Sequence, residues 1–456
     1  MTMRKPSKSL DLWMNGHQVG QWSIEAGVDV LQYDSQWLHN KLGRPLSLSL
    51  PFTPGNLPHK GEKVRFYFEN LLPDHQEVRN RVARRYKLKT ADAYDLLREV
   101  GRDCVGALQI LPAGEVPSRD QRVVFEPMNE AQVAAHIRSI AQAGPVGWQP
   151  DEEAPFRISI AGAQDKTALL HWDGQWGLPQ GATPSTHILK PALGVTGGQQ
   201  IDMRDSVENE WLCAQILEAY GLPVAACEIL CFEDQKVLSV QRFDRRVWQG
   251  DQLMRLPQED MCQATGTSPA QKYESDGGPG IDAIMKLLDS SRARERDRFT
   301  FFMAQLLFWM LAAVDGHAKN FSLFIKTEGR YEMTPLYDVI SAYPYMGKKA
   351  HQLQPKRVKL AMAVRSKNTH WLVHQIARRH WVALGQRYGI QSPKGYGIQS
   401  PKGYGIEELL NKVVEQTPHA IATVQRKLPL NFPQTVSEPI FAGLQQAAMR
   451  LAESQP

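Results

Sequence analysis

Hydrophobic and polar positions change their spacing along the chain, and the first stretch mixes short strands with helices. Alternation broken at Asn15-Gly16 predicts a β-hairpin there, because this dipeptide favours the tight turn between two strands. The other predicted elements are a strand at Ser47–Pro51, helices at His75–Tyr86 and Ala91–Val100, and a strand at Gly106–Leu111.

Beyond residue 155 the spacing predicts strands first and helices afterwards. The predicted strands are Arg157–Ile160, Thr167–Trp172, His187–Lys190, Glu228–Phe232 and Val237–Gln241. Val207–Tyr220 has the spacing of an amphipathic helix, and helices dominate after Gly280. A segment rich in Pro, Gly and acidic residues, Gly144–Pro155, separates the two stretches. We therefore expect an α+β protein with units at 1–143, 144–245 and 246–456.

The longest apolar run, Phe299–Val314, predicts a helix that is buried on all sides. It is too short to span a bilayer, so we expect no membrane segment. Met1–Leu10 is basic and polar and lacks the apolar core of a secretory signal. The five cysteines show no metal-binding spacing, which favours buried thiols in a reducing cytoplasm.

Charge is distributed unevenly over the 456 residues, which carry 53 Lys and Arg against 48 Asp and Glu, a net charge of +5. Val339–Ile406 contains twelve Lys and Arg and no acidic residue, so this window carries +12 and the rest carries −7. Such asymmetry indicates a polyanionic partner, with a solvated basic face as the alternative.

A perfect repeat lies inside this basic window. The eight residues from Tyr388 to Gly395 recur at Tyr396–Gly403, and Tyr404-Gly-Ile406 begins a third copy. Gly and Pro every eight residues predict an exposed, mobile loop, and perfect copies suggest a recent duplication without a catalytic role.

The informative polar segment, Asp315-Gly-His-Ala-Lys-Asn320, follows the apolar run directly. A hairpin is predicted next, ending near Asp338, and should bring Asn320 and Asp338 side by side with Asp315 facing the same space. Carboxylate and amide oxygens are ligands that Mg²⁺ accepts together with phosphate oxygens. Protein kinases use the same order: a catalytic Asp, an Asn five residues on, a hairpin and a metal-binding Asp.

Three further segments could complete a phosphotransferase. Small residues in Ser159–Lys166 would let backbone N–H groups approach phosphates. Lys190 ends an apolar strand and is either a cation for phosphates or an edge residue that reaches solvent. Gln241-Arg-Phe-Asp244 ends another strand where a lobe-connecting hinge would contact adenine, with core packing as the alternative for Phe243.

These residues together resemble the HipA family, the serine/threonine kinase toxins of bacterial toxin–antitoxin pairs. Six stretches in the family's order carry the resemblance: Arg44–Pro51, Asn70–Asp74, Phe156–Lys166, Leu256–Cys262, Lys272–Gly280 and Asp315–Asn320. The resemblance implies a two-lobed kinase-like fold with an N-terminal β-containing subdomain and a helical C-terminal lobe.

The resemblance also implies roles for individual residues. Asp315 is then the catalytic base, Asn320 and Asp338 hold Mg²⁺, and Ser159 is the autophosphorylated serine. The implied ATP-binding residues are Ala161, Gly162, Ala163, Gln164, Asp165, Lys166, Lys190, Gln241, Arg242, Phe243, His317, Lys319 and Asn320. A phosphate on Ser159 would repel ATP from the loop that follows.

The implied partners are glutamyl-tRNA synthetase as substrate, a small helix-turn-helix antitoxin of the HipB type, and operator DNA bound through the complex. Phosphorylation of the synthetase would arrest growth and produce persistence. Two features depart from the family: Gln241 stands where other members carry Glu, and the duplicated loop lies near the predicted DNA contacts Arg378, Arg379 and Arg387.

Two other functions remain open from the residues alone. The acid-free window favours a protein that acts mainly as a DNA-binding co-repressor. The Asp315, Asn320 and Asp338 set would equally serve a small-molecule phosphotransferase.

Overall fold

A computed structural model describes residues 8–117, 122–141, 164–392 and 404–453. Several predicted features lie outside these ranges. They are the separating segment, the strand at 157–160, Ser159, Ala161, Gly162 and Ala163, and all of the second repeat copy.

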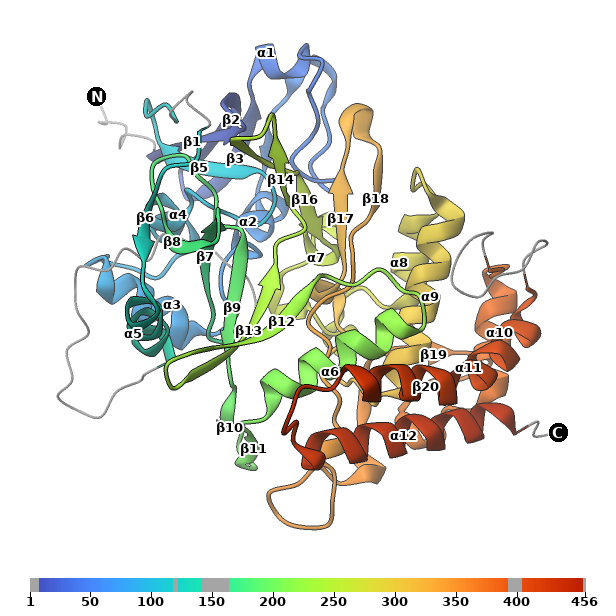
Figure 1. The fold of residues 1–456 in the computed structure, drawn as a ribbon. Helices are drawn as coiled ribbons and strands as arrows, with labels where there is room; N and C mark the ends of the chain where they lie inside the picture. Colours follow the sequence, from blue (N-terminus) through green and yellow to red (C-terminus); the bar gives the residue numbers. More distant parts are fainter. Residues whose placement is uncertain (1–7, 118–121, 142–163, 393–403, 454–456) are drawn as a thin grey trace.

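The N-terminal unit is built on a five-stranded sheet in the order β4-β3-β2-β1-β5 (Figure 1). Asn15 and Gly16 both take positive φ, 46° and 80°, so the predicted hairpin forms between β1 and β2. The strands are β1 (Lys8–Met14), β2 (His17–Glu25), β3 (Val28–Tyr33), β4 (His59–Lys60) and β5 (Leu108–Pro112). Its helices are α1 (Ser35–Leu38), α2 (Glu62–Glu69), α3 (Gln76–Arg85) and α4 (Ala93–Val100).

The strand predicted at Ser47–Pro51 does not form, and this prediction is wrong. Only one bridge joins Ser47 to Leu50, within a turn. The hydroxyls of Ser47 and Ser49 donate instead to the Gln263 carbonyl oxygen, at 3.1 and 2.7 Å. Alternation here reflects a segment that packs against the C-terminal half of the chain.

A second sheet has six strands in the order β12-β13-β9-β7-β8-β6. The strands are β6 (Phe125–Met128), β7 (Thr167–Trp172), β8 (Gln175–Pro179), β9 (His187–Pro191), β12 (Cys227–Phe232) and β13 (Gln235–Gln241). Helices α5 (Glu130–Ala141) and α6 (Ser206–Ala219) cover it, and a small hairpin, β10 (Gly194–Thr196) with β11 (Ile201–Met203), extends from β9. Adjacent strand residues point to opposite faces, so Val237 packs with the α5 core and Leu238 with the α6 core.

The division into three units remains a proposal, and the second sheet bears on its first boundary. β6 and α5 precede residue 143, yet β6 pairs with β8 and α5 packs on this sheet. We therefore propose moving that boundary to the β5–β6 connection.

Helix α6 differs from the predicted amphipathic helix, because eleven of its fourteen residues are buried. It lies between the second sheet and the C-terminal helices (Figure 1). Its buried polar side chains are therefore paired: Glu208 with Lys236, Glu210 with Lys190, and Asn209 with the Ser341 backbone.

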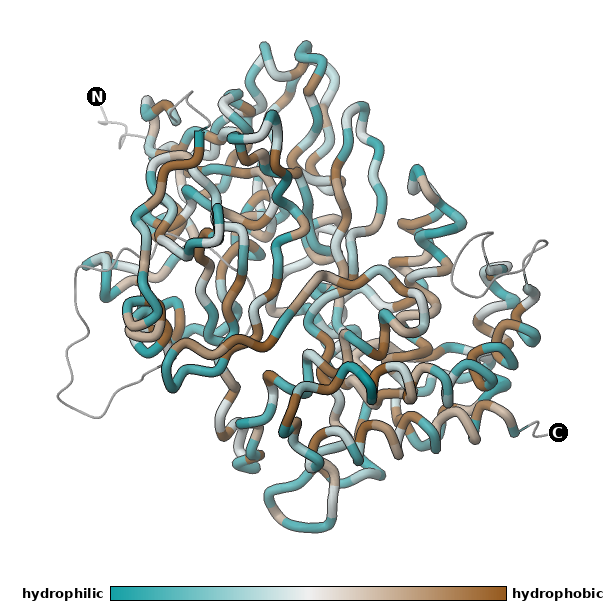
Figure 2. Tube along the Cα trace, in the orientation of Figure 1, coloured by the Kyte–Doolittle hydropathy of each residue, from teal (hydrophilic) through white to brown (hydrophobic). Residues whose placement is uncertain are grey.

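Helices dominate the remaining chain, as predicted, around the largest core (Figure 2). They are α7 (Met261–Thr265), α8 (Ile281–Leu288), α9 (Arg294–Met310), α10 (Arg378–Arg387), α11 (Ile406–Lys427) and α12 (Gln434–Ala452). The strands here are β14 (Arg245–Trp248), β15 (Gln252–Arg255), β16 (Gln258–Asp260), β17 (Ser322–Ile325), β18 (Tyr331–Met333), β19 (Lys359–Arg365) and β20 (Thr369–Leu372).

Helix α9 is buried from Phe299 onward, which confirms the prediction from its apolar run. It ends four residues before Val314, because the chain turns at Ala312 with a φ of 47°. That turn carries Asp315 out of the core. No helix in the described ranges is both long and apolar enough to cross a membrane.

Candidate active site

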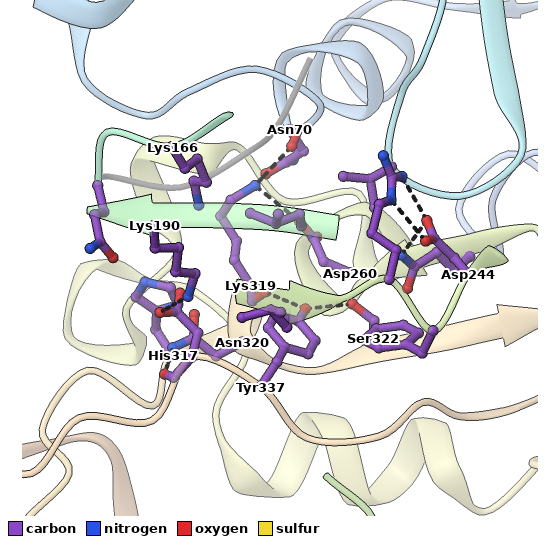
Figure 3. Close-up of a pocket in the computed structure, with 18 of the residues that line it drawn as sticks. Asn70, Lys166, Lys190, Asp244, Asp260, His317, Lys319, Asn320, Ser322 and Tyr337 are labelled. Atoms are coloured by element: carbon purple, nitrogen blue, oxygen red, sulfur yellow. Dashed lines mark hydrogen bonds and ion pairs between the residues drawn. The ribbon is translucent and has the colours of Figure 1, made fainter. Parts of the chain in front are cut away.

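A cleft of about 1210 Å³, open solvent included, lies between strands β9 and β13 of the second sheet and the loop that follows α9 (Figure 3). The N-terminal unit also reaches it through Asn70 and Leu71. Most of the predicted site residues within the described ranges line this one cleft.

The loop after α9 brings the three predicted polar residues together. The Asn320 side-chain amide donates to the backbone carbonyl oxygens of Asp315, at 2.8 Å, and Asp338, at 3.2 Å. β17 and β18 form the intervening hairpin, which confirms the expectation that Asn320 and Asp338 lie side by side. Gly316 permits the tight path, because a Cβ there would lie 2.4 Å from the Phe308 ring.

Lys190 extends from β9 toward the same place and contacts two carboxylates. Its ammonium lies 2.6 Å from Glu210 Oε1 and 2.9 Å from Asp338 Oδ1. Glu210 was missed by the sequence reasoning. The available signal was that a buried lysine needs a carboxylate, and α6 is the next helix with buried acidic residues. A strand lysine paired with a helix glutamate is the arrangement that protein kinases use to hold the nucleotide-binding lysine.

The charges in this group shift one another's protonation. Burial alone would raise the pKa of the Asp338 carboxyl, but Lys190 and Lys166 reverse this and hold it well below its usual range. Burial would lower the pKa of Lys190, whereas Asp338 and Glu210 hold it above its usual range. Lys190 and Asp338 are therefore both charged at neutral pH.

Lys166 lines the cleft beside this group and has no hydrogen-bond or ion-pair partner among the described residues. Burial, opposed by Asp338 and reinforced by Lys190, lowers its pKa to about 8. Its neighbours are fixed from outside the cleft: Asp165 pairs with Arg81 of α3, and Gln164 donates to the Pro191 carbonyl at 2.7 Å.

Asp315 is half exposed toward the cleft, and one of its carboxylate oxygens accepts a hydrogen bond from the Tyr273 hydroxyl. Tyr273 was also missed, although its segment was recognised as part of a family motif. His317 is buried beneath them, with its Nε2 3.9 Å from Asp315 Oδ1 and its ring edge-on to Tyr273. Burial lowers the pKa of His317, so its imidazole is neutral at pH 7.

Lys319 lines the cleft wall, but its ammonium is bound to protein groups on the side away from Lys190 (Figure 3). It donates to the backbone oxygen of Asn70 at 3.0 Å, to the Asn70 side chain at 2.8 Å and to Asp260 at 2.9 Å. These contacts join the loop after α9 to the N-terminal unit.

The predicted hinge, Gln241–Phe243, also lines the cleft. The N–H groups of Gln241 and Arg242 donate to the carbonyls of Ala226 and Thr186, whereas the Phe243 N–H has no partner within the described ranges. The Arg242 guanidinium points away into a buried cluster with Asp103 and Asp244. The backbone at Phe243 is therefore available to a ligand, and the Arg242 side chain is not.

The three arginines predicted to contact DNA lie on α10, away from the cleft. Arg378 donates to the backbone oxygens of Leu451 and Glu407, and Arg387 donates to the Ser366 backbone oxygen and to the Asp282 carboxylate. Arg379 is exposed. Elsewhere in the basic window, several exposed residues form no ion pair with the described part of the chain, namely Lys348, Lys349, Lys356, Arg357 and Lys359.

Comparison with known proteins identifies relatives over most of the chain. Residues 10–111 match the HipA N-terminal domain, and residues 158–421 match the HipA-like C-terminal domain. The protein Y4mE of Sinorhizobium fredii is 33% identical over 361 residues, covering 77% of this chain and 82% of the relative.

Two further matches come from Shewanella oneidensis. Its serine/threonine-protein kinase toxin HipA is 26% identical over 355 residues, covering 74% of this chain and 76% of that protein. One chain of a solved complex of HipA, HipB and operator DNA from the same organism has the same fold. The match covers 97% of this chain and 97% of that chain, with a TM-score of 0.74 and 23% identity.

The fold confirms the predicted α+β, kinase-like architecture with a helical C-terminal lobe. The matched domains cover both the N-terminal sheet and the lobes that form the cleft. The chain is a kinase of the HipA family.

Proposed function

We propose that the protein is an ATP- and Mg²⁺-dependent serine/threonine protein kinase toxin. The observation that carries this proposal is the Lys190–Glu210 pair, which shares one cleft with Asp315, Asn320 and Asp338. A small-molecule phosphotransferase would share these groups. The match to a serine/threonine-protein kinase toxin over most of the chain favours a protein acceptor.

In this proposal each group has one task. The acceptor hydroxyl gives its proton to the Asp315 carboxylate as its oxygen bonds the γ-phosphorus. The bond from that phosphorus to the β–γ bridging oxygen breaks, and ADP leaves. Lys190 and Lys166 offset the phosphate charge, and the Phe243 N–H, which donates to no protein group in the described ranges, can orient adenine.

The donor set fits Mg²⁺ bound together with a nucleotide. Asn320 uses its amide nitrogen within the protein, which leaves its oxygen for a ligand, and Asp338 is charged and 31% exposed. The described residues contain no cluster of three or more His, Cys, Asp or Glu that could hold a metal ion. One carboxylate and one amide suit Mg²⁺, which takes its other ligands from phosphates and water. When bound, Mg²⁺ neutralises charge developing on the phosphates.

The proposal is tested with Asp315→Asn, which keeps the side chain's shape and removes its basicity. We expect ³²P transfer from ATP into the protein and growth inhibition both to be lost, while ATP binding persists. Asp276→Asn, an exposed acid of the neighbouring loop, is the control. Unchanged phosphorylation by Asp315→Asn would contradict the assignment, and transfer to sugars or aminoglycosides alone would favour the small-molecule alternative.

We further propose that Ser159 is the autophosphorylation site and that glutamyl-tRNA synthetase is the substrate, which links activity to growth arrest and persistence. Both follow from the motif resemblance, and Ser159 lies outside the described ranges. Intact mass spectrometry should show one phosphoryl group in the wild type and none in Ser159→Ala. Purified glutamyl-tRNA synthetase should gain ³²P from the Ser159→Ala protein, and its failure to do so would point to another substrate.

A HipB-type antitoxin and operator DNA are the proposed partners, and we place the protein in the cytoplasm. All five cysteines are free thiols, which suits a reducing compartment. The related Shewanella HipA was solved with HipB and its operator DNA. Co-purification with an antitoxin encoded beside this protein would support the partnership, and a lack of complex would contradict it.

A co-repressor would contact DNA through the basic window, Val339–Ile406. The hydrogen bonds made by the α10 arginines indicate which of its residues remain available for such contacts. Arg378 and Arg387 are engaged within the chain, so the exposed lysines are better placed to reach DNA phosphates, namely Lys348, Lys349, Lys356 and Lys359. Each lysine that neutralises a phosphate should contribute about one to the slope of log Kobs against log[salt], and its replacement by Gln should remove that contribution. An unchanged slope would leave DNA contact to the antitoxin.

A further inference from the structure

We propose that Tyr273 is a positioning residue for Asp315, and that the N-terminal unit holds it in place through Lys272 and Asp74. This inference rests on the proposed kinase activity. It assigns to the N-terminal unit a part in aligning the catalytic base.

The contact between Tyr273 and Asp315 is selective for one carboxylate oxygen. The phenol donates to Oδ1, and the carboxylate is 56% exposed on the cleft side. At the main chain, Asn320 already fixes the Asp315 carbonyl at 2.8 Å. The second hydrogen bond fixes the side-chain rotamer and leaves Oδ2 for the proton of an acceptor hydroxyl.

Tyr273 is suited to remain a donor. Burial and the nearby Asp315 charge hold its pKa well above the ordinary value for tyrosine, so the phenol keeps its proton throughout the neutral range. Its ring packs edge-on to His317, with 5.0 Å between ring centroids and an angle of 85°. This packing holds the Tyr273 ring in the orientation in which its hydroxyl reaches Asp315 Oδ1.

The residues on either side of Tyr273 are anchored. The Lys272 carbonyl accepts a hydrogen bond from the Ala318 N–H at 3.2 Å, within the loop that carries Asp315 and Asn320. Glu274 accepts from the Ala363 N–H at 2.7 Å and pairs with Arg365. A Cβ on Gly278 would lie 1.9 Å from the Gln271 carbonyl oxygen, so the turn that follows is tightly packed.

The N-terminal unit supplies the remaining anchor. Asp74 accepts from the Lys272 ammonium at 2.8 Å, and both side chains are largely buried. Asp74 also lies 3.9 Å from Lys319, whose other contacts are with Asn70 and Asp260. The segment Asn70–Asp74 therefore contacts the catalytic loop directly through Lys319, and reaches Asp315 through Lys272 and Tyr273.

The test compares Tyr273→Phe with Tyr331→Phe by steady-state ³²P transfer to glutamyl-tRNA synthetase, or by the single-turnover rate of ³²P transfer to the protein itself. Tyr331 donates to the Leu287 carbonyl at 2.5 Å in the C-terminal half and does not line the cleft, so Tyr331→Phe controls for the loss of one tyrosine hydroxyl hydrogen bond. We expect Tyr273→Phe to lower kcat about ten- to a hundredfold, with the KM for ATP unchanged within about twofold. Tyr331→Phe should leave both constants unchanged.

The N-terminal anchor is tested separately with Lys272→Met and Lys272→Arg. We expect Lys272→Met to lower kcat in the same direction, and Lys272→Arg to restore most of the rate, since a guanidinium can reach Asp74. These variants also test the inference if Tyr273→Phe does not fold.

The outcomes separate this inference from the proposed function. An active wild type with an equally active Tyr273→Phe would overturn the positioning role. An equal fall in kcat and in ATP affinity would also overturn it, because it would indicate general disturbance of the cleft. A wild type that transfers no phosphate to itself or to the synthetase would instead overturn the proposed function.

Discussion

Two ionic clusters adjoin the cleft, and they differ in how many of their charged groups have a partner within the described ranges. The site cluster consists of Lys190, Glu210 and Asp338, with Lys166 beside it. The junction cluster consists of Asp103, Arg242, Asp244, Arg245 and Arg255, and joins the N-terminal unit to the strands around the hinge.

In the junction cluster every carboxylate oxygen has at least one partner. Asp103 accepts from Arg242, Arg245, Arg255 and the Ser185 hydroxyl and N–H, and Asp244 accepts from Arg242, Gln258 and the Gly106 N–H. Burial would raise the pKa of Asp103, but the three arginines hold it far below its usual range. Such a closed network can fix structure but has no group left for a ligand.

In the site cluster, by contrast, some charged groups have no partner within the described ranges. Asp338 is 31% exposed, against 6% for Asp103, and one of its carboxylate oxygens has no partner within the described ranges. Lys166 is charged at neutral pH and forms no ion pair with the described part of the chain. Charges that remain unpaired beside an open cleft favour a polyanionic ligand and its metal ion. We therefore expect loss of activity from changes in one cluster and loss of stability from changes in the other.

The largest effect is expected for Lys190→Met. Removing this cation should lower kcat/KM about a hundred- to a thousandfold, because phosphate charge is no longer offset. Stability should change little, since burial already raises the pKa of Glu210 and that carboxyl can take up a proton. Phosphoryl transfer and urea unfolding should be measured on the same sample. A folded and fully active Lys190→Met would show that the site cluster is structural.

The opposite pattern is expected for Asp103→Ala. It leaves the buried Arg255 guanidinium without a carboxylate partner and Arg245 with Asp244 alone, which should cost about 3–5 kcal/mol of unfolding free energy. The protein that remains folded should keep a KM for ATP near that of the wild type. Urea denaturation measures the first quantity and steady-state kinetics the second. Loss of activity without loss of stability would break the distinction between the clusters.

The sequence correctly predicted those elements and contacts that are determined by residues close together in the chain. Strands β7, β9 and β13 and helix α9 lie close to their predicted bounds, because short apolar runs in the strands and a long one in the helix carry that information locally. The order Asp315, Asn320, hairpin, Asp338 predicted a convergence that the Asn320 hydrogen bonds confirm. A hairpin fixes the positions of its own two ends, so no distant contact was needed.

The sequence could not predict partners that tertiary packing selects. Glu210 is one of several acids on α6, and only its position under β9 decides that it meets Lys190. Tyr273 lies 42 residues before Asp315, and no periodicity connects them. Arg387 counted toward the acid-free window, yet its partner Asp282 lies outside that window in sequence. Local charge counts therefore overestimated the free positive charge.

A pH dependence distinguishes the clusters further. Lys166, with a pKa of about 8 lowered mainly by burial, is protonated below pH 8 and neutral above it. Bound phosphates would favour the charged form, so ATP binding should take up a proton above pH 8. We expect the KM for ATP to rise above pH 8, by at most about tenfold per pH unit, with kcat less affected.

Lys166→Arg is the matched variant for this prediction. A guanidinium keeps its charge across this range, so the KM for ATP should stay level between about pH 7 and about pH 9.5. The junction cluster's carboxylates, Asp103 and Asp244, have pKa values held below their usual range by the arginines, so they stay charged throughout this pH range. A rise in KM that persists in Lys166→Arg would assign the titration to another group.

The smallest effect is expected beside the site cluster, where Arg81 of α3 pairs with Asp165 next to Lys166. Both side chains are about one-third exposed, so solvent screens the pair and Arg81→Gln should cost less than about 1 kcal/mol of stability. The KM for ATP should rise about two- to threefold, because Asp165 would then hold the neighbouring Lys166 less firmly in place. Arg84→Gln, an exposed arginine of the same helix, is the control. A tenfold change in KM would mean that this partly exposed pair belongs functionally to the site cluster, and that the N-terminal unit also supports nucleotide binding.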